Sequence, residues 1–133
     1  MPAPGGGRIV LFTSGQHRGP MPSEIPYAAT KGALQQITAT RADALAERGV
    51  TVNCLNPGPT DTGWALADTD AADALAMPCG RWNTPDEAAS VVALLLSDDA
   101  ATITGQVIDA RGEVQELIRG HRDVVASARC ERP

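Results

Sequence analysis

The chain of 133 residues has no excess of positive charge, few aromatic side chains and no long apolar run. Its net charge is −5 and only 3% of its residues are aromatic. A basic face for binding nucleic acid is therefore not expected, because such faces neutralise phosphates with clustered lysine and arginine. No apolar stretch approaches the roughly 20 residues of a membrane-spanning helix, and no basic start followed by an apolar stretch predicts a secretory signal. These absences predict one small globular domain.

Cysteine and histidine are too few and too scattered to indicate a metal site. Cys54, Cys79 and Cys130 form no C-x-x-C pair, and His17 and His121 lie far apart in the sequence. Any disulfide would leave one cysteine over. The pattern favours reduced thiols in a cytoplasmic protein that binds no metal.

Local patterns predict strands that alternate with helices. Apolar runs bounded by glycine or proline predict strands at 9–12, 50–55 and 106–110. Helical spacing predicts helices over 26–48 and from 85 to about 97. Since this alternation implies crossover connections, we expect an α/β fold with a parallel sheet. Three strands are fewer than the two βαβαβ halves of a doubly wound domain.

Each predicted helix has its own sequence signals. In the first helix, Leu34, Ile37 and Leu45 share one stripe, and Arg41 interrupts it. We expect this stripe to be buried, with the arginine reaching out to solvent or to a partner. In the second helix, Thr84 and Glu87 have the spacing of a capping box.

The only lysine and the only tyrosine are four residues apart in the first helix. Tyr27 and Lys31 therefore share a helix face. A free tyrosine is a poor acid or base near neutral pH, and a nearby cation favours its phenolate. With Ser14 at a strand end, the three groups are suited to exchange a proton with, and hold, a carbonyl or alcohol oxygen. An exposed helical pair without function is the alternative for Tyr27 and Lys31 alone.

Five segments together resemble the short-chain dehydrogenase/reductase family, most closely its 3-oxoacyl-thioester reductase-like branch. The resemblance covers about residues 8–110. It implies the C-terminal half of a Rossmann-type doubly wound parallel sheet, with about three strands and flanking helices. The segments are Thr13-Ser14-Gly15, 27–34, 48–62, 80–89 and 97–107.

The resemblance also implies residue roles and a cofactor, NAD or NADP. Tyr27 is then the catalytic acid/base, Lys31 favours its phenolate and binds the nicotinamide ribose, and Ser14 polarises the substrate carbonyl. The implied reaction is hydride transfer between the cofactor and a small-molecule carbonyl or secondary alcohol. Cofactor contacts fall on Tyr27, Lys31, Pro57, Gly58, Thr60 and Thr62, and substrate contacts on Gln16 and Trp64.

The glycine-rich TGxxxGxG loop of the family has no counterpart in this sequence. We therefore expect a flexible lead-in over 1–7, a partial Rossmann domain with the Ser-Tyr-Lys site over 8–110, and a charged tail over 111–133. Activity then requires the missing N-terminal half. As partners we expect either further copies of this chain in a homo-oligomer or an intact relative to which the chain docks. Two alternatives remain: a catalytically inactive truncated fragment that binds a partner or is vestigial, and a nucleotide-sugar epimerase or dehydratase, which shares the Tyr-x-x-x-Lys pair.

Overall fold

The computed structural model describes residues 6–63 and 80–110, and within them it contains one open parallel sheet. Strands β1 (Arg8–Phe12), β2 (Thr51–Asn56) and β3 (Val107–Asp109) lie in the order β1-β2-β3. Both pairings are parallel. The predicted fold class is confirmed. The predicted tail and most of the predicted lead-in lie outside the described residues.

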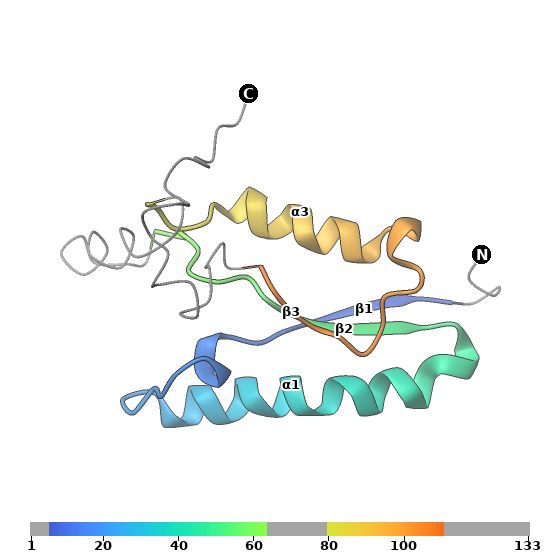
Figure 1. Ribbon diagram of the computed structural model, residues 1–133, viewed down its shortest axis with the longest axis horizontal. Helices are drawn as coiled ribbons and strands as arrows, with labels where there is room; N and C mark the ends of the chain where they lie inside the picture. The colour runs from blue at the N-terminus through green and yellow to red at the C-terminus, as the bar shows by residue number, and fades with distance from the viewer. Residues whose placement is uncertain (1–5, 64–79, 111–133) are drawn as a thin grey trace, which may run out of the picture.

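Two helices cover opposite faces of this sheet. Figure 1 shows α1 (Ile25–Leu45) along one face and α3 (Pro85–Leu96) along the other. A short 3-10 turn extends α1, and Gly49 then ends it with a left-handed φ of 66°. The α3 capping box is present, since the Thr84 side chain accepts from the Glu87 amide and the Glu87 side chain accepts from the Thr84 amide. Both helices therefore lie close to their predicted positions.

The buried side of α1 differs from the predicted stripe. Thr38 and Ala42 are the buried residues of the helix, whereas Ile37 is 40% exposed and Arg41 is exposed. Leu34 and Leu45 are half-buried and Arg41 reaches solvent, as predicted, but the prediction was wrong for Ile37, because the small residues Thr38 and Ala42 are the ones fully buried. A Cβ placed on Gly105 would lie 3.6 Å from the Ala42 Cβ, so the chain passes close to this face of α1. The buried hydroxyl of Thr38 donates a hydrogen bond to the Leu34 carbonyl within the helix.

The core is centred on β2, the middle strand. All six of its residues are buried. Asn53 is 1% exposed, and its side chain binds the Ile103 carbonyl and the Gln106 amide, which fixes the turn before β3. Cys54 is buried and free, as predicted, and burial raises the pKa of its thiol. Cys79 and Cys130 lie outside the described residues.

The outer edge of β1 pairs with no other strand among the residues described. Ile9 and Phe12 of this strand are 38% and 41% exposed. Unpaired edges with apolar side chains are normally covered in a folded protein. Neither α1 nor α3 has the length and apolar character needed to cross a membrane, within the part of the chain described.

Candidate active site

The carboxyl ends of all three strands meet at one edge of the sheet, where the predicted site residues gather. The Thr13 amide donates to the Leu55 carbonyl at 2.9 Å, and the Ala110 amide donates to the Asn56 carbonyl at 2.9 Å. These bonds continue both ladders to the point where the chain leaves the sheet. Ligand sites of open parallel sheets form at this edge.

Ser14 lies directly after β1 and precedes the 3-10 turn η1 (Gly15–His17). Its backbone N–H donates to Gln16 Oε1 at 3.2 Å, and its carbonyl oxygen lies 3.1 Å from His17 Nδ1. The Ser14 hydroxyl makes no capping bond to the turn. The backbone of Ser14 is therefore held on both sides while its hydroxyl is not used by the turn.

Tyr27 and Lys31 stand on the first turns of α1 and face one another, as their spacing predicts. The Lys31 Nζ lies 5.7 Å from the centroid of the Tyr27 ring, within cation–π range. It also donates to the carbonyl of Phe12, the last residue of β1, at 3.3 Å. Tyr27 is 44% exposed, so its ring is open to a ligand. One ammonium group thus connects the tyrosine with the strand end that carries Ser14.

The loop after β2 carries the predicted cofactor contacts and is fixed by two asparagines. Asn56 Oδ1 accepts from the Gly58 amide at 3.2 Å. Asn83 Nδ2 donates to the Pro57 carbonyl at 2.8 Å. The hydroxyl of Thr60 donates to the Gly58 carbonyl at 3.1 Å. The loop is therefore preorganised.

The backbone of Thr60 is suited to receive a planar amide. Thr60 and Asn83 form a parallel bridge in which Asn83 donates to the Pro59 carbonyl and accepts from the Asp61 amide. The N–H and C=O of Thr60 itself point away from Asn83 in such a bridge. This orientation fits the implied contact with a nicotinamide carboxamide. Thr62 is exposed, and Trp64 lies outside the described residues.

The side-chain amide of Gln16, a predicted substrate contact, is bound within the protein. Its Nε2 donates to Thr13 Oγ1 and to Gln35 Oε1, each at 2.8 Å, and its Oε1 accepts from the Ser14 amide. The structure therefore brings Gln16 beside Ser14 and ties it to α1. Its contact with substrate stays a prediction.

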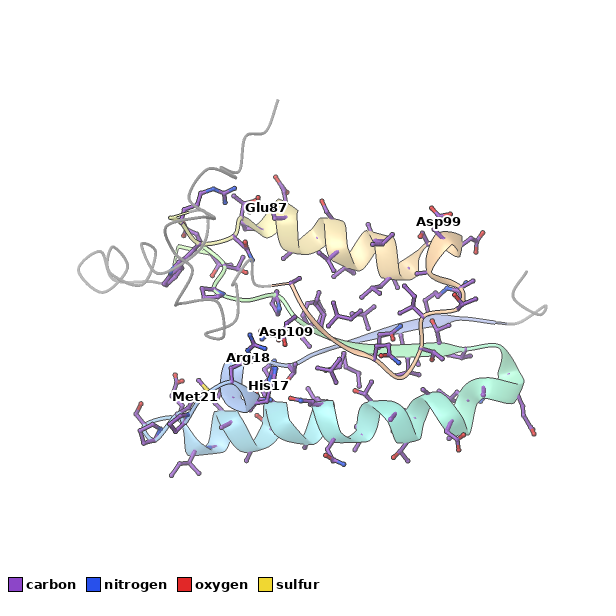
Figure 2. The ribbon with its side chains drawn as sticks, in the orientation of Figure 1. His17, Arg18, Met21, Glu87, Asp99 and Asp109 are labelled. Atoms are coloured by element: carbon purple, nitrogen blue, oxygen red, sulfur yellow. The ribbon has the colours of Figure 1, made fainter. Side chains whose placement is uncertain are left out.

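A cluster of His17, Arg18 and Asp109 lies beside Ser14 and was not predicted from the sequence. Asp109 Oδ1 accepts from Asn56 Nδ2 at 2.7 Å, and Asp109 Oδ2 lies 3.1 Å from His17 Nε2 and 3.4 Å from Arg18. Figure 2 shows His17, Arg18 and Asp109 directed toward one another. Burial alone would raise the pKa of Asp109, but hydrogen bonds from Asn56 and His17, with the charges of His17 and Arg18, hold that pKa below its ordinary value.

The available signal for this cluster was the position of Asp109 at the end of a predicted strand, since carboxyl ends of parallel strands meet. The histidine 92 residues earlier gave no sign of this partner. Among the residues described, no three His, Cys, Asp or Glu side chains gather as a metal site would require. The cluster is therefore a hydrogen-bonded ion-pair network.

Most of this chain matches known proteins. A family model described as enoyl-(acyl carrier protein) reductase matches residues 1–112. The uncharacterized oxidoreductase YjdA of Bacillus subtilis is 48% identical over 106 residues, which cover 80% of this chain and 42% of that protein. The 3-oxoacyl-[acyl-carrier-protein] reductase FabG of Salmonella typhimurium is 43% identical over 89 residues, covering 65% and 36%.

A solved structure also superposes well. The angucycline C-6 ketoreductase LanV with bound NADP is 39% identical, with a TM-score of 0.76 over 82% of this chain and 44% of that one. The chain spans less than half the length of each of these relatives.

Proposed function

The chain belongs to the short-chain dehydrogenase/reductase family, and on this premise we propose that it carries the proton-transfer half of an NAD(P)-dependent carbonyl reductase or alcohol dehydrogenase. Its homologues are oxidoreductases that use NAD or NADP. The substrate class we propose is a small ketone or 3-oxoacyl thioester. Similarity to FabG supports the thioester.

The contact of Lys31 with both Tyr27 and the end of β1 carries this proposal. In the reducing direction, the substrate carbonyl oxygen accepts hydrogen bonds from the hydroxyls of Ser14 and Tyr27. Tyr27 then gives its phenol proton to that oxygen as the new C–H bond forms, and the ammonium of Lys31 stabilises the remaining phenolate. Solvent returns the proton to Tyr27.

The cofactor side of the site is formed by the loop after β2. A bound nicotinamide would supply the hydride for the new C–H bond. Thr60 would hold the carboxamide with its backbone amide and carbonyl, and the Lys31 ammonium would bind a ribose hydroxyl. Pro57 and Gly58 would form the loop against the nicotinamide, and Thr62 would contact the phosphates. These assignments rest on the motif resemblance together with the loop geometry described above.

The open edge of β1 supports a role for a covering partner. Its exposed Ile9 and Phe12 would be covered by the first half of a Rossmann domain, such as an intact relative carries. A free, buried thiol at Cys54 agrees with a reducing, cytoplasmic location. The same exposed edge favours the alternative function, a non-catalytic fragment that binds such a partner.

The test compares the native polypeptide that carries this sequence, purified from its source, with the 133-residue chain. Oxidation of NADH and NADPH is followed with a panel of ketones and 3-oxoacyl thioesters. Replacing Tyr27 by phenylalanine removes the proton donor and should lower kcat by about 10²–10⁴-fold, with dinucleotide affinity retained. Thr40→Val removes a hydroxyl from an exposed position of the same helix and should have no effect.

Either of two results would decide against this function. Full turnover in Tyr27→Phe would exclude Tyr27 as the proton donor. If neither form of the protein binds a dinucleotide or turns over any carbonyl, the reductase function is wrong. The non-catalytic alternative would then be supported by recovery of a bound relative with the native polypeptide.

A further inference from the structure

Two residues that follow Ser14 contact its backbone, one at the N–H and one at the carbonyl oxygen. The carboxamide of Gln16 accepts from the Ser14 N–H, and the imidazole of His17 bonds to the Ser14 carbonyl. Gly15 is the only residue between Ser14 and this pair. A single 3-10 turn is short enough for both side chains to fold back onto the residue that begins it. We call Ser14, Gln16 and His17 together the serine clamp.

One arm of the serine clamp is anchored on the helix that carries the proton donor. Gln16 Nε2 donates at 2.8 Å to Gln35, which lies one helical turn beyond Lys31. It also donates at 2.8 Å to the hydroxyl of Thr13, and that hydroxyl donates to the Lys31 carbonyl at 3.1 Å. Any shift of α1 along the sheet is therefore transmitted to the amide of Ser14.

The other arm is anchored on the ends of β2 and β3. His17 Nε2 meets Asp109 Oδ2 at 3.1 Å, and the second oxygen of Asp109 accepts from Asn56 at 2.7 Å. Asn56 is 2% exposed and also binds the Gly58 amide of the cofactor loop. Arg18, the residue after η1, adds its charge at 3.4 Å. This arm joins Ser14 to the loop that we assign to the nicotinamide.

The two ring nitrogens of His17 serve different partners. Nδ1 lies 3.1 Å from the Ser14 carbonyl oxygen, and Nε2 lies 3.1 Å from Asp109 Oδ2. Each contact therefore occupies one side of the ring, and the two can be removed separately.

The geometry points to His17, with Asp109 as its anchor, as a positioning residue that sets the Ser14 hydroxyl relative to Tyr27 and to the cofactor loop. This inference rests on the proposed function, since Ser14 has to be the residue that holds the substrate oxygen. His17 does not touch the reacting atoms in this arrangement. Its contribution is orientation, and displacement of a substrate-holding group by about 1 Å can lower a rate about 100-fold.

Two substitutions separate the contacts of His17. Glutamine places its amide near the position of Nε2, so His17→Gln keeps the bond to Asp109 and loses the bond to Ser14. Asparagine places its amide near the position of Nδ1, so His17→Asn keeps the bond to the Ser14 carbonyl and loses the bond to Asp109. Asp109→Asn removes the anchoring charge with almost no change of shape. Arg41→Gln is the matched control, because Arg41 is exposed on α1 and lies outside the serine clamp and its two anchoring arms.

The experiment measures kcat, KM and the backbone amide signal of Ser14 by NMR, with the native polypeptide in the same buffers. Both His17 variants and Asp109→Asn should lower kcat by about 10- to 100-fold, leave the dinucleotide KM unchanged and shift the Ser14 amide signal. Arg41→Gln should preserve kcat. If one His17 variant fails to fold, the other still decides.

The positioning role is wrong if both His17 variants keep the wild-type kcat, even when the Ser14 amide shifts. It is also wrong if the Ser14 amide does not respond to either variant, because the clamp is then absent. Failure of the proposed function is a separate result: wild-type protein without turnover, or with turnover that survives Tyr27→Phe. In that case the catalytic purpose of the clamp is refuted, while the Ser14 signal still reports whether the clamp forms.

Discussion

Replacing Asn56 by alanine tests the network behind the site most directly. Asn56 is 2% exposed, donates to Asp109 at 2.7 Å and accepts from the Gly58 amide at 3.2 Å. A hydrogen bond to a charged group contributes about 1.5–3 kcal/mol to stability and a neutral one about 0.5–1.5 kcal/mol. We therefore expect Asn56→Ala to lower the free energy of unfolding by about 2–4.5 kcal/mol at neutral pH.

This cost should depend on pH because Asp109 carries the charge. The network lowers the pKa of Asp109 below its ordinary value of 3.8. Its stabilisation is therefore fully present above that value and is lost as the pH falls through the pKa in the folded protein. Once Asp109 is protonated, its bond with Asn56 becomes a neutral one. The difference between wild type and Asn56→Ala should then shrink by about 1 kcal/mol.

The assay is urea unfolding followed by circular dichroism at a series of pH values from neutral downward. Urea is uncharged and leaves the ion pairs unscreened. Asn53→Ala is the matched control, because Asn53 is 1% exposed and its side chain bonds only neutral backbone groups. Its cost should not change between neutral and acidic pH. A cost for Asn56→Ala that is equally independent of pH would refute the reasoning.

Two further predictions concern the elements that support the site. Thr84→Ala removes the capping bond to the Glu87 amide and should cost about 1 kcal/mol of stability, measured by urea unfolding, whereas Thr84→Ser should cost little; equal costs would argue against the cap. Gly105→Ala forces φ of +71° on a residue with a side chain and should destabilise by about 1–2 kcal/mol, while Gly32→Ala, with open space at its Cβ, should stabilise α1 by up to about 1 kcal/mol. Thermal unfolding measures the two glycine variants, and Tm shifts of the same sign for Gly105→Ala and Gly32→Ala would contradict this prediction.

Strands, helices and their caps could be predicted from the sequence because each has a local signal. The run at 9–12, the box formed by Thr84 with Glu87, and the stop at Gly49 are complete within a few residues. The buried side of α1 could not be predicted from apolar spacing. It depends on how closely Gly105 passes Ala42, a distance that no helical pattern contains.

The candidate site also contains one part that the sequence predicts and one part that it does not. Ser14, Tyr27 and Lys31 were predicted because one helical turn and one strand end bring them together. The bond between His17 and Asp109 joins residues 92 positions apart and depends on strand order. The parallel order β1-β2-β3 places those two residues at the same edge, and sequence spacing alone does not contain that order.

The central position of β2 has a consequence for how the protein is made. Among the residues described, both ladders of the sheet use β2, so neither of these two pairings can form until residues 51–56 have been synthesised. From that point β1, α1 and β2 have all their mutual partners, whereas β3 adds only three further positions. Of the elements described, we therefore expect the β1-α1-β2 unit to form before β3 joins it on the ribosome. The ion pair that anchors His17 closes only after Asp109, at the end of β3, has been translated.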